Sequence, residues 1–84
     1  MSKIAEFCDI EVYMDNRFEG MPYVSIIYLD DDVEGEIDLQ TGEIKGGFSK
    51  YVIPVISAWF GDNKDILLNM WGNKRIELLP SWGE

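Results

Sequence analysis

The densest cluster of chemically active side chains in this sequence is a run of carboxylates. Seven acids and no lysine or arginine lie between residues 30 and 43, namely Asp30, Asp31, Asp32, Glu34, Glu36, Asp38 and Glu43. Carboxylates that lie close together can bind a hard cation, exchange protons with a substrate or present negative charge to a basic partner. The spacing of the acids helps to separate these three kinds of chemistry.

Part of the run matches the start of a calcium-binding loop. Asp30, Asp32, Glu34 and Gly35 occupy positions 1, 3, 5 and 6 of the pattern D-x-[DN]-x-[DN]-G. The twelfth position is Thr41, however, where the pattern needs a glutamate that binds calcium through both oxygens, and the flanking residues favour strands rather than helices. A carboxylate metal site is therefore the least favoured alternative, and we predict that the protein has no cofactor.

Catalysis has little support in the remaining residues. The chain has no histidine, no glycine-rich phosphate loop and no second cysteine beside Cys8, so the usual nucleophilic, zinc and nucleotide sites lack their ligands. Paired carboxylates act as acid and base when burial separates their pKa values, but these acids are predicted to lie on a solvent-exposed face. We predict that the protein is not an enzyme.

The alternating acids are better explained as part of a surface. Residues two apart on a strand lie about 6.7 Å apart on the same side. The residues predicted to form such a row of negative charge are Asp32, Glu34, Glu36 and Asp38. A row of this kind keeps a sheet face solvated and discourages edge pairing, or it docks on a basic groove that normally holds nucleic acid. Both explanations stay open, and the density of the acids favours the second explanation, docking on a basic groove.

Composition limits the class of protein and of partner. A chain of 84 residues with 46% hydrophobic residues can bury one core, so we predict a single domain over residues 1–84. Sixteen acids against seven bases give a formal net charge of -9, which disfavours direct contact with nucleic acid or an anionic membrane. No apolar run or signal-peptide pattern is present, so we expect a cytoplasmic monomer or homodimer with a basic protein partner.

The first half of the chain is predicted to form a β-sheet. Apolar and polar residues alternate in residues 9–14 and 33–39, and residues 23–29 are β-branched and aromatic. The glycine of Gln40-Thr41-Gly42 favours a tight turn, and such short connections favour an antiparallel meander. The predicted strands are residues 9–14, 23–29, 33–39 and 43–45, with residues 75–79 as a further candidate.

The spacing of the apolar residues changes after the predicted sheet, which indicates helices. An apolar stripe begins in residues 52–60, and Pro54 places the start of the regular helix near Ile53. Gly61 is predicted to end this helix, Asp62 to cap a second one and Gly72 to end the second. The fold class is therefore predicted to be α+β, a small antiparallel β-meander of three to five strands packed against two short helices.

The aromatic residues and the cysteine can be assigned in part. Trp59, Phe60 and Trp71 lie on the apolar helix stripes and are predicted to belong to the core. Trp82 has two explanations, since it either folds back over a small core or belongs to an aromatic interface. Cys8 is predicted to be a small buried hydrophobic residue rather than a reactive thiol.

The order of short motifs resembles the bacterial family known as domain of unknown function 4160. The resemblance runs from VYM through a loop ending in proline to EIDLQTGEIKGG, VISAW and ILLNMW, and it covers roughly residues 9 to 72. Members carry a histidine-rich loop, D-H-x-P-P-H-F-H, and are linked to toxin–antitoxin pairs. Here the comparable stretch places Arg17, Tyr23 and Ser25 about where the histidines would fall. The resemblance therefore implies the fold and transfers no site residues.

Together these features predict a small acidic protein–protein interaction module. The leading hypothesis is an inhibitor that occupies a basic, nucleic-acid-binding surface of a partner, as a nucleic-acid mimic such as a phage anti-CRISPR or counter-defence protein does, or an antitoxin-like protein. The alternatives are a toxin–antitoxin scaffold that binds through its aromatic C-terminus and, less favoured, a carboxylate metal-binding protein. The predicted partner-binding residues are Asp30, Asp31, Asp32, Glu34, Glu36 and Asp38, with Arg17, Phe18 and Tyr23 as specificity contacts.

Overall fold

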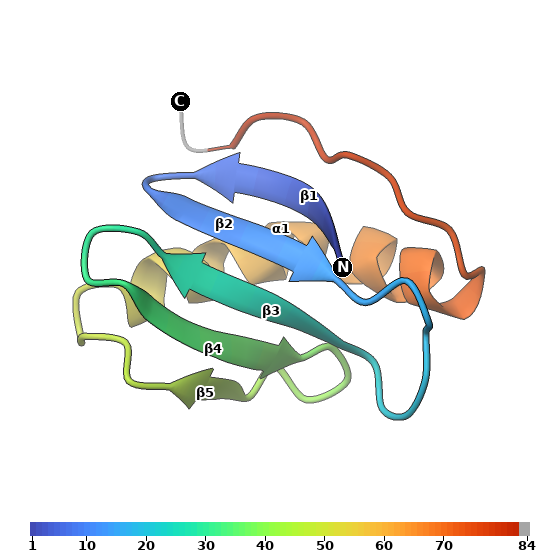
Figure 1. The fold of residues 1–84 in the computed structure, drawn as a ribbon, viewed down its shortest axis with the longest axis horizontal. Coiled ribbons are helices and arrows are strands. Elements are labelled where there is room, and N and C mark those ends of the chain that lie inside the picture. The colour runs from blue at the N-terminus through green and yellow to red at the C-terminus, as the bar shows by residue number, and fades with distance from the viewer. Residues whose placement is uncertain (83–84) are drawn as a thin grey trace.

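The computed structural model describes residues 1–82 and shows an antiparallel sheet packed on one helix (Figure 1). The order of the five strands in the sheet follows their order in the chain, so the sheet is a meander. The predicted α+β class and the meander are therefore confirmed. The elements are β1 (Ser2–Phe7), β2 (Ile10–Met14), β3 (Tyr23–Tyr28), β4 (Val33–Asp38), β5 (Ile44–Gly46) and α1 (Ile53–Gly72).

One face of the sheet is apolar because buried side chains alternate along the central strands. Val12 of β2 lies opposite Ile26 of β3, and both are fully buried. Ile26 in turn lies opposite Gly35 of β4, and Ile37 two residues later is also fully buried. The helix α1 covers this face, as Figure 1 shows. Among residues 1–82, no helix packs on the opposite face of the sheet, which carries the polar side chains.

Residues 53–72 form one continuous helix of 20 residues, so the prediction of two short helices is wrong. Gly61 and Asp62 lie inside α1, where a glycine costs about 1 kcal/mol relative to alanine. Asn63 continues the inner face past the glycine, and its side chain donates a hydrogen bond to the carbonyl of Trp59 at 2.9 Å. Burial of the apolar stripe on both sides of Gly61 outweighs the local cost. The buried residues of this stripe are Ile56, Trp59, Phe60, Leu67, Met70 and Trp71.

The helix boundaries agree with the sequence pattern even though the internal break does not exist. α1 begins at Ile53 with Pro54 in its first turn, where a proline is tolerated because its missing N–H would have no partner. It ends at Gly72, as predicted. Within residues 1–82, no helix is both long and apolar enough to span a membrane.

The edge of the sheet at β1 differs from the prediction. β1 was not predicted because Ile4 and Ala5 are adjacent and break the alternation, whereas the structure buries both of them through an irregularity between Lys3 and Ala5. Residues 75–79 are not a strand. They belong to an extended tail that runs alongside β1 in space, where the Leu79 N–H donates to the carbonyl of Ile4 at 2.7 Å.

Aromatic stacking joins the helix, β1 and the tail. The rings of Phe7 and Trp59 stack with centroids 5.1 Å apart, and the ring of Trp82 packs edge-on against Phe7 at 5.2 Å. The indole N–H of Trp82 also donates to the Asp62 carboxylate at 2.8 Å, so Trp82 folds back on its own chain. Cys8, by contrast, is exposed, which contradicts the prediction of a buried thiol. Its place in the tight turn between β1 and β2 turns it away from the core.

Candidate protein interaction surface

The uncovered face of the sheet is the candidate site, and we call it the open face. Its side chains come from positions that alternate with the buried ones, and the strand register aligns them in rows across the sheet. One row crosses all five strands through Lys3, Tyr13, Ser25, Glu36 and Lys45. The next row contains Glu6, Glu11, Ile27 and Glu34.

The acidic run does not form the continuous row that the sequence predicts. Glu34 and Glu36 are exposed on the open face, as expected. Asp32 instead lies in the turn before β4 with a φ of 52°, and this left-handed conformation interrupts the strand alternation. Asp38 is half-buried, and its Oδ1 accepts hydrogen bonds from the backbone N–H groups of Gln40 at 2.8 Å and Thr41 at 3.1 Å. The carboxylate of Asp38 therefore holds the turn after β4.

Three of the predicted partner-binding acids gather in the turn between β3 and β4. Asp30, Asp31 and Asp32 are all exposed there. The turn between β1 and β2 lies at the same end of the sheet, because the Leu29 N–H donates to the Asp9 carbonyl at 2.9 Å (Figure 1). The pKa of Tyr28 is raised by burial of its hydroxyl and by the nearby carboxylates of Asp30, Asp31 and Asp9. This end of the molecule is therefore strongly negative.

Basic residues neutralise only one side of the open face. Lys3 pairs with Glu6 and with Glu11, whose Oε2 lies 3.1 Å from the Lys3 Nζ. The hydrogen bond from Lys3 lowers the pKa of Glu11, and Glu11 also accepts a hydrogen bond from the Tyr13 hydroxyl at 3.1 Å. On β4, in contrast, Glu34 and Glu36 have no ion pair within the described part of the chain, although Lys45 lies opposite Glu36.

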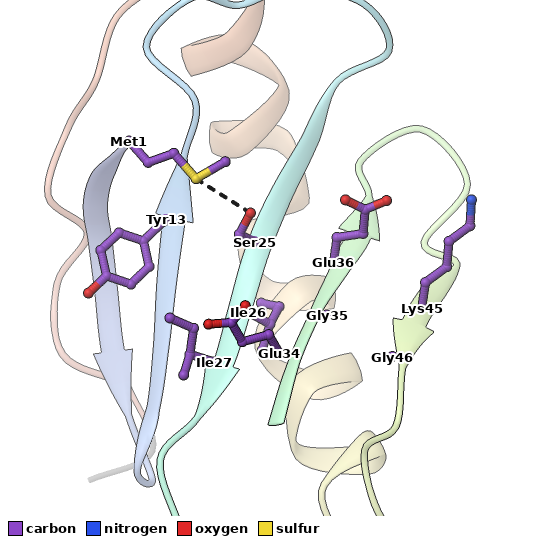
Figure 2. Close-up of a pocket in the computed structure, with 10 residues that line it drawn as sticks. All are labelled: Met1, Tyr13, Ser25, Ile26, Ile27, Glu34, Gly35, Glu36, Lys45 and Gly46. Carbon is purple, nitrogen blue, oxygen red and sulfur yellow. Dashed lines mark hydrogen bonds between the residues drawn. The ribbon is translucent and has the colours of Figure 1, made fainter. Parts of the chain in front are cut away.

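A shallow hollow of about 590 Å³ lies on the open face (Figure 2). Ser25 is the small residue at its centre, with Tyr13 on the neighbouring strand to one side and Glu36 to the other. Ile27 and Gly35 contribute apolar surface to the lining. The side chain of Met1 reaches over Ser25, with its sulfur 3.6 Å from the Ser25 Oγ.

Sequence reasoning missed the residues that face the acids across this hollow. Tyr13, Ser25 and Ile27 lie on strands that it identified correctly, but no motif marks them. Their positions opposite the acids depend on the pairing of β2, β3 and β4. Alternation along each strand would have placed them on the outer face, and only the register brings them beside Glu34 and Glu36.

The predicted specificity contacts lie elsewhere. The loop that carries Arg17 and Phe18 is at the opposite end of the sheet from the Asp30–Asp32 turn (Figure 1). Arg17 binds its neighbour Asp15, with Nη2 3.0 Å from Oδ2, and these hydrogen bonds lower the pKa of Asp15 to about 2. The rings of Phe18 and Tyr23 lie 5.6 and 5.7 Å from that of Trp71, so both aromatic side chains pack toward the core.

Neither a metal-binding arrangement among residues 1–82 nor a match to a known protein assigns a function to the open face. Among residues 1–82, no group of three or more cysteine, aspartate or glutamate side chains is arranged to hold a metal ion. Comparison of the chain with protein-family models, with curated proteins and with solved structures finds no match. The charge and shape of the open face are therefore the basis for assigning a function.

Proposed function

We propose that this protein is a small acidic interaction module that inhibits a partner by occupying its basic, nucleic-acid-binding surface. One observation carries the proposal: the exposed carboxylates of the β3–β4 hairpin have no ion-pair partner within residues 1–82. These carboxylates belong to Asp30, Asp31, Asp32, Glu34 and Glu36. We expect such an inhibitor to act in the cytoplasm, where a protein of the anti-CRISPR or antitoxin kind would meet its target.

The physical basis of the proposal is electrostatic attraction. The chain has a formal net charge of -9, and the hairpin concentrates part of that charge without neutralising it. Carboxylates two residues apart on β4 give one charge per about 6.7 Å of strand, whereas a DNA strand carries one charge per about 3.4 Å of helix axis. The hairpin is therefore a coarse imitation of a nucleic acid. A coarse imitation suffices to steer association with a basic groove, and its effect falls as salt increases.

The alternative of a scaffold that binds through its aromatic C-terminus is less favoured. Trp82 packs against Phe7 and donates a hydrogen bond to Asp62, so its ring is engaged within the chain. A partner that bound this ring would first have to displace it. The resemblance to domain of unknown function 4160 remains a prediction, and its link to toxin–antitoxin pairs is compatible with either interaction role.

A matched pair of charge-reversed variants tests the proposal. The first variant carries Asp32→Lys, Glu34→Lys and Glu36→Lys in the hairpin. The control carries Glu19→Lys, Asp65→Lys and Glu77→Lys, which are exposed acids outside the hairpin, so both variants change the net charge equally. Each tagged protein is used to capture partners from a cell lysate at low and at high salt, and circular dichroism checks that each variant is folded.

We expect the wild type and the control to retain a nucleic-acid-binding protein at low salt and to release it at high salt or when excess DNA is added. The hairpin variant should retain none of it. Equal retention by the hairpin variant, or a partner that binds independently of salt and is not displaced by DNA, would contradict the proposal.

A further inference from the structure

We propose that the hollow on the open face receives an arginine side chain of the partner protein. This inference rests on the proposed function, because it names the group that a basic surface would present to the β3–β4 hairpin. Three features of the hollow carry it: an aromatic ring that is held in place, two carboxylates that form no ion pair with any of residues 1–82, and an apolar lining between them.

The ring of Tyr13 forms one wall of the hollow and is fixed by a chain of polar contacts. Its hydroxyl donates to Glu11 Oε1 at 3.1 Å, and Glu11 Oε2 accepts a hydrogen bond from Lys3 at 3.1 Å. A cation that lies over an aromatic face within about 6 Å of its centroid is attracted by the ring. Because the ring is already held, little conformational entropy is lost when a cation binds against it.

Glu36 stands on the other side of the hollow from Tyr13. Ser25 lies between them in the same cross-strand row, and neighbouring strands are about 4.8 Å apart, so the backbones of Tyr13 and Glu36 are about 10 Å apart. The small Ser25 side chain fills little of that width, and the exposed side chain of Met1, whose sulfur lies 3.6 Å from the Ser25 Oγ, would rotate away to admit a guanidinium (Figure 2). A planar guanidinium can stack on the ring and still donate to the carboxylate across this gap.

Ile27 and Gly35 supply the surface on which the aliphatic part of the side chain would lie. Ile27 is half-buried between Glu11 and Glu34 in the second row of the open face. The methylene groups of arginine prefer such an apolar surface while its charged end reaches a carboxylate. Arginine is favoured over lysine because its planar group both stacks on a ring and donates paired hydrogen bonds.

Lys45 gives the proposal an additional consequence. It lies opposite Glu36 on the short edge strand β5 and forms no ion pair with it in the structure of residues 1–82. Its positive charge beside the hollow opposes the arrival of a second cation. Replacement of Lys45 by alanine should therefore strengthen the binding of an arginine side chain, which a generic loss of surface contacts would not do.

Capped tetra-arginine and tetra-lysine peptides are suitable probes for a titration of the full chain followed by ¹⁵N NMR. Tetra-arginine should shift the amide signals of Tyr13, Ser25, Ile27 and Glu36, and tetra-lysine should bind about fivefold more weakly. Tyr13→Leu and Glu36→Gln should each weaken tetra-arginine binding about fivefold, and Lys45→Ala should strengthen it. Tyr13→Phe keeps the ring but removes the hydrogen bond to Glu11 that holds it, so its affinity should lie between those of the wild type and Tyr13→Leu.

Glu43→Gln is the control, because it removes one negative charge from an exposed acid outside the hollow and should change the affinity less than about twofold. Shifts confined to the Asp30–Asp32 turn, equal affinities for the two peptides, or equal effects of Glu36→Gln and Glu43→Gln would overturn the arginine site. If those results accompanied capture of a nucleic-acid-binding protein from lysate, the proposed function would stand without the hollow. Arginine-specific binding with no such capture would support the hollow and reject the inhibitor role.

Discussion

Gly35 of β4 lies directly opposite Gly46 of β5, and the ring of Phe48 packs against both glycines. The absence of side chains at this pair lets Phe48, which is buried, fill the space under the edge of the sheet. A methyl group at Gly35 would collide with the backbone carbonyl of Lys45 and with the Phe48 ring. The pair therefore fixes how β5 joins the sheet, and with it the position of Lys45 beside the hollow.

Gly35→Ala should destabilise the fold. Because one of the colliding groups is backbone, the strand pair cannot adjust by a side-chain rotation alone, and overpacking of this kind costs about 1–3 kcal/mol. Gly47→Ala is the matched control, since its side chain would meet open space. Urea unfolding followed by tryptophan fluorescence measures both, and identical midpoints for the two variants would show that β5 is loosely attached.

The turn between β1 and β2 should accept a stabilising replacement. Phe7 pairs with Ile10, and the two residues between them, Cys8 and Asp9, have φ values of 48° and 62°. This is the conformation that Asn-Gly adopts most easily in a two-residue hairpin turn. The double variant Cys8→Asn, Asp9→Gly should raise the free energy of unfolding by about 1 kcal/mol. Cys8→Val, with a β-branched side chain at the same backbone conformation, should lower the free energy of unfolding. A double variant that is less stable than Cys8→Val would contradict the assignment of the turn.

Asp15 should make the fold sensitive to acid. Its hydrogen bonds from the side chain and backbone of Arg17 lower the pKa from 3.8 to about 2 in the folded protein. A carboxyl with a lowered folded pKa contributes stability above its ordinary pKa, and this contribution is lost as the pH falls from about 4 to about 2. The melting temperature of the wild type should therefore exceed that of Asp15→Asn near neutral pH, and this difference should become smaller as the pH falls from about 4 to about 2.

Carboxyl ¹³C NMR measures the pKa of Asp15 directly. Arg17→Met should raise it toward 3.8, while Arg75→Met, which alters an exposed arginine with no ion pair among residues 1–82, should leave it unchanged. A wild-type Asp15 that titrates near 3.8 would show that the contact with Arg17 does not persist in solution.

Two neighbouring leucines test whether the tail is anchored to β1. Leu79 is buried and its N–H donates to Ile4, whereas Leu78 is 76% exposed. Leu79→Ala should lower the free energy of unfolding by about 2–3 kcal/mol, and Leu78→Ala should change it by less than about 0.5 kcal/mol. Hydrogen exchange should also show a protected Leu79 amide. Similar small effects of both substitutions would mean that the tail does not contribute to the core.

The sequence predicts those parts of the fold in which local pattern and tertiary packing agree. β2 and β4 follow from alternation, β3 follows from its β-branched and aromatic residues, and the start of α1 follows from Pro54. The pattern fails at β1, where a strand irregularity buries two adjacent residues, and at Gly61, where an apolar face that continues past the glycine outweighs its low helix propensity. Both failures concern long-range packing, which a local pattern does not contain.

The candidate site could be predicted only in part for a similar reason. The exposure of Glu34 and Glu36 follows from alternation within β4. The turn conformation of Asp32 and the use of Asp38 to hold the next turn depend on how the hairpin closes. The contribution of Tyr13 depends on the register of two other strand pairs, which residue types alone do not determine.

The meander order of the strands has a consequence for the order in which the chain can fold. Every strand pairs with its neighbour in sequence, so each pairing closes only a short loop, and folds with such local contacts form quickly. All five strands precede α1 in the chain, so during synthesis the last strand residue, Gly46, is made before the first residue of α1, Ile53. The apolar face of the sheet therefore stays exposed until α1 has been made. Docking of α1 covers that face and removes the surface through which newly made chains would aggregate.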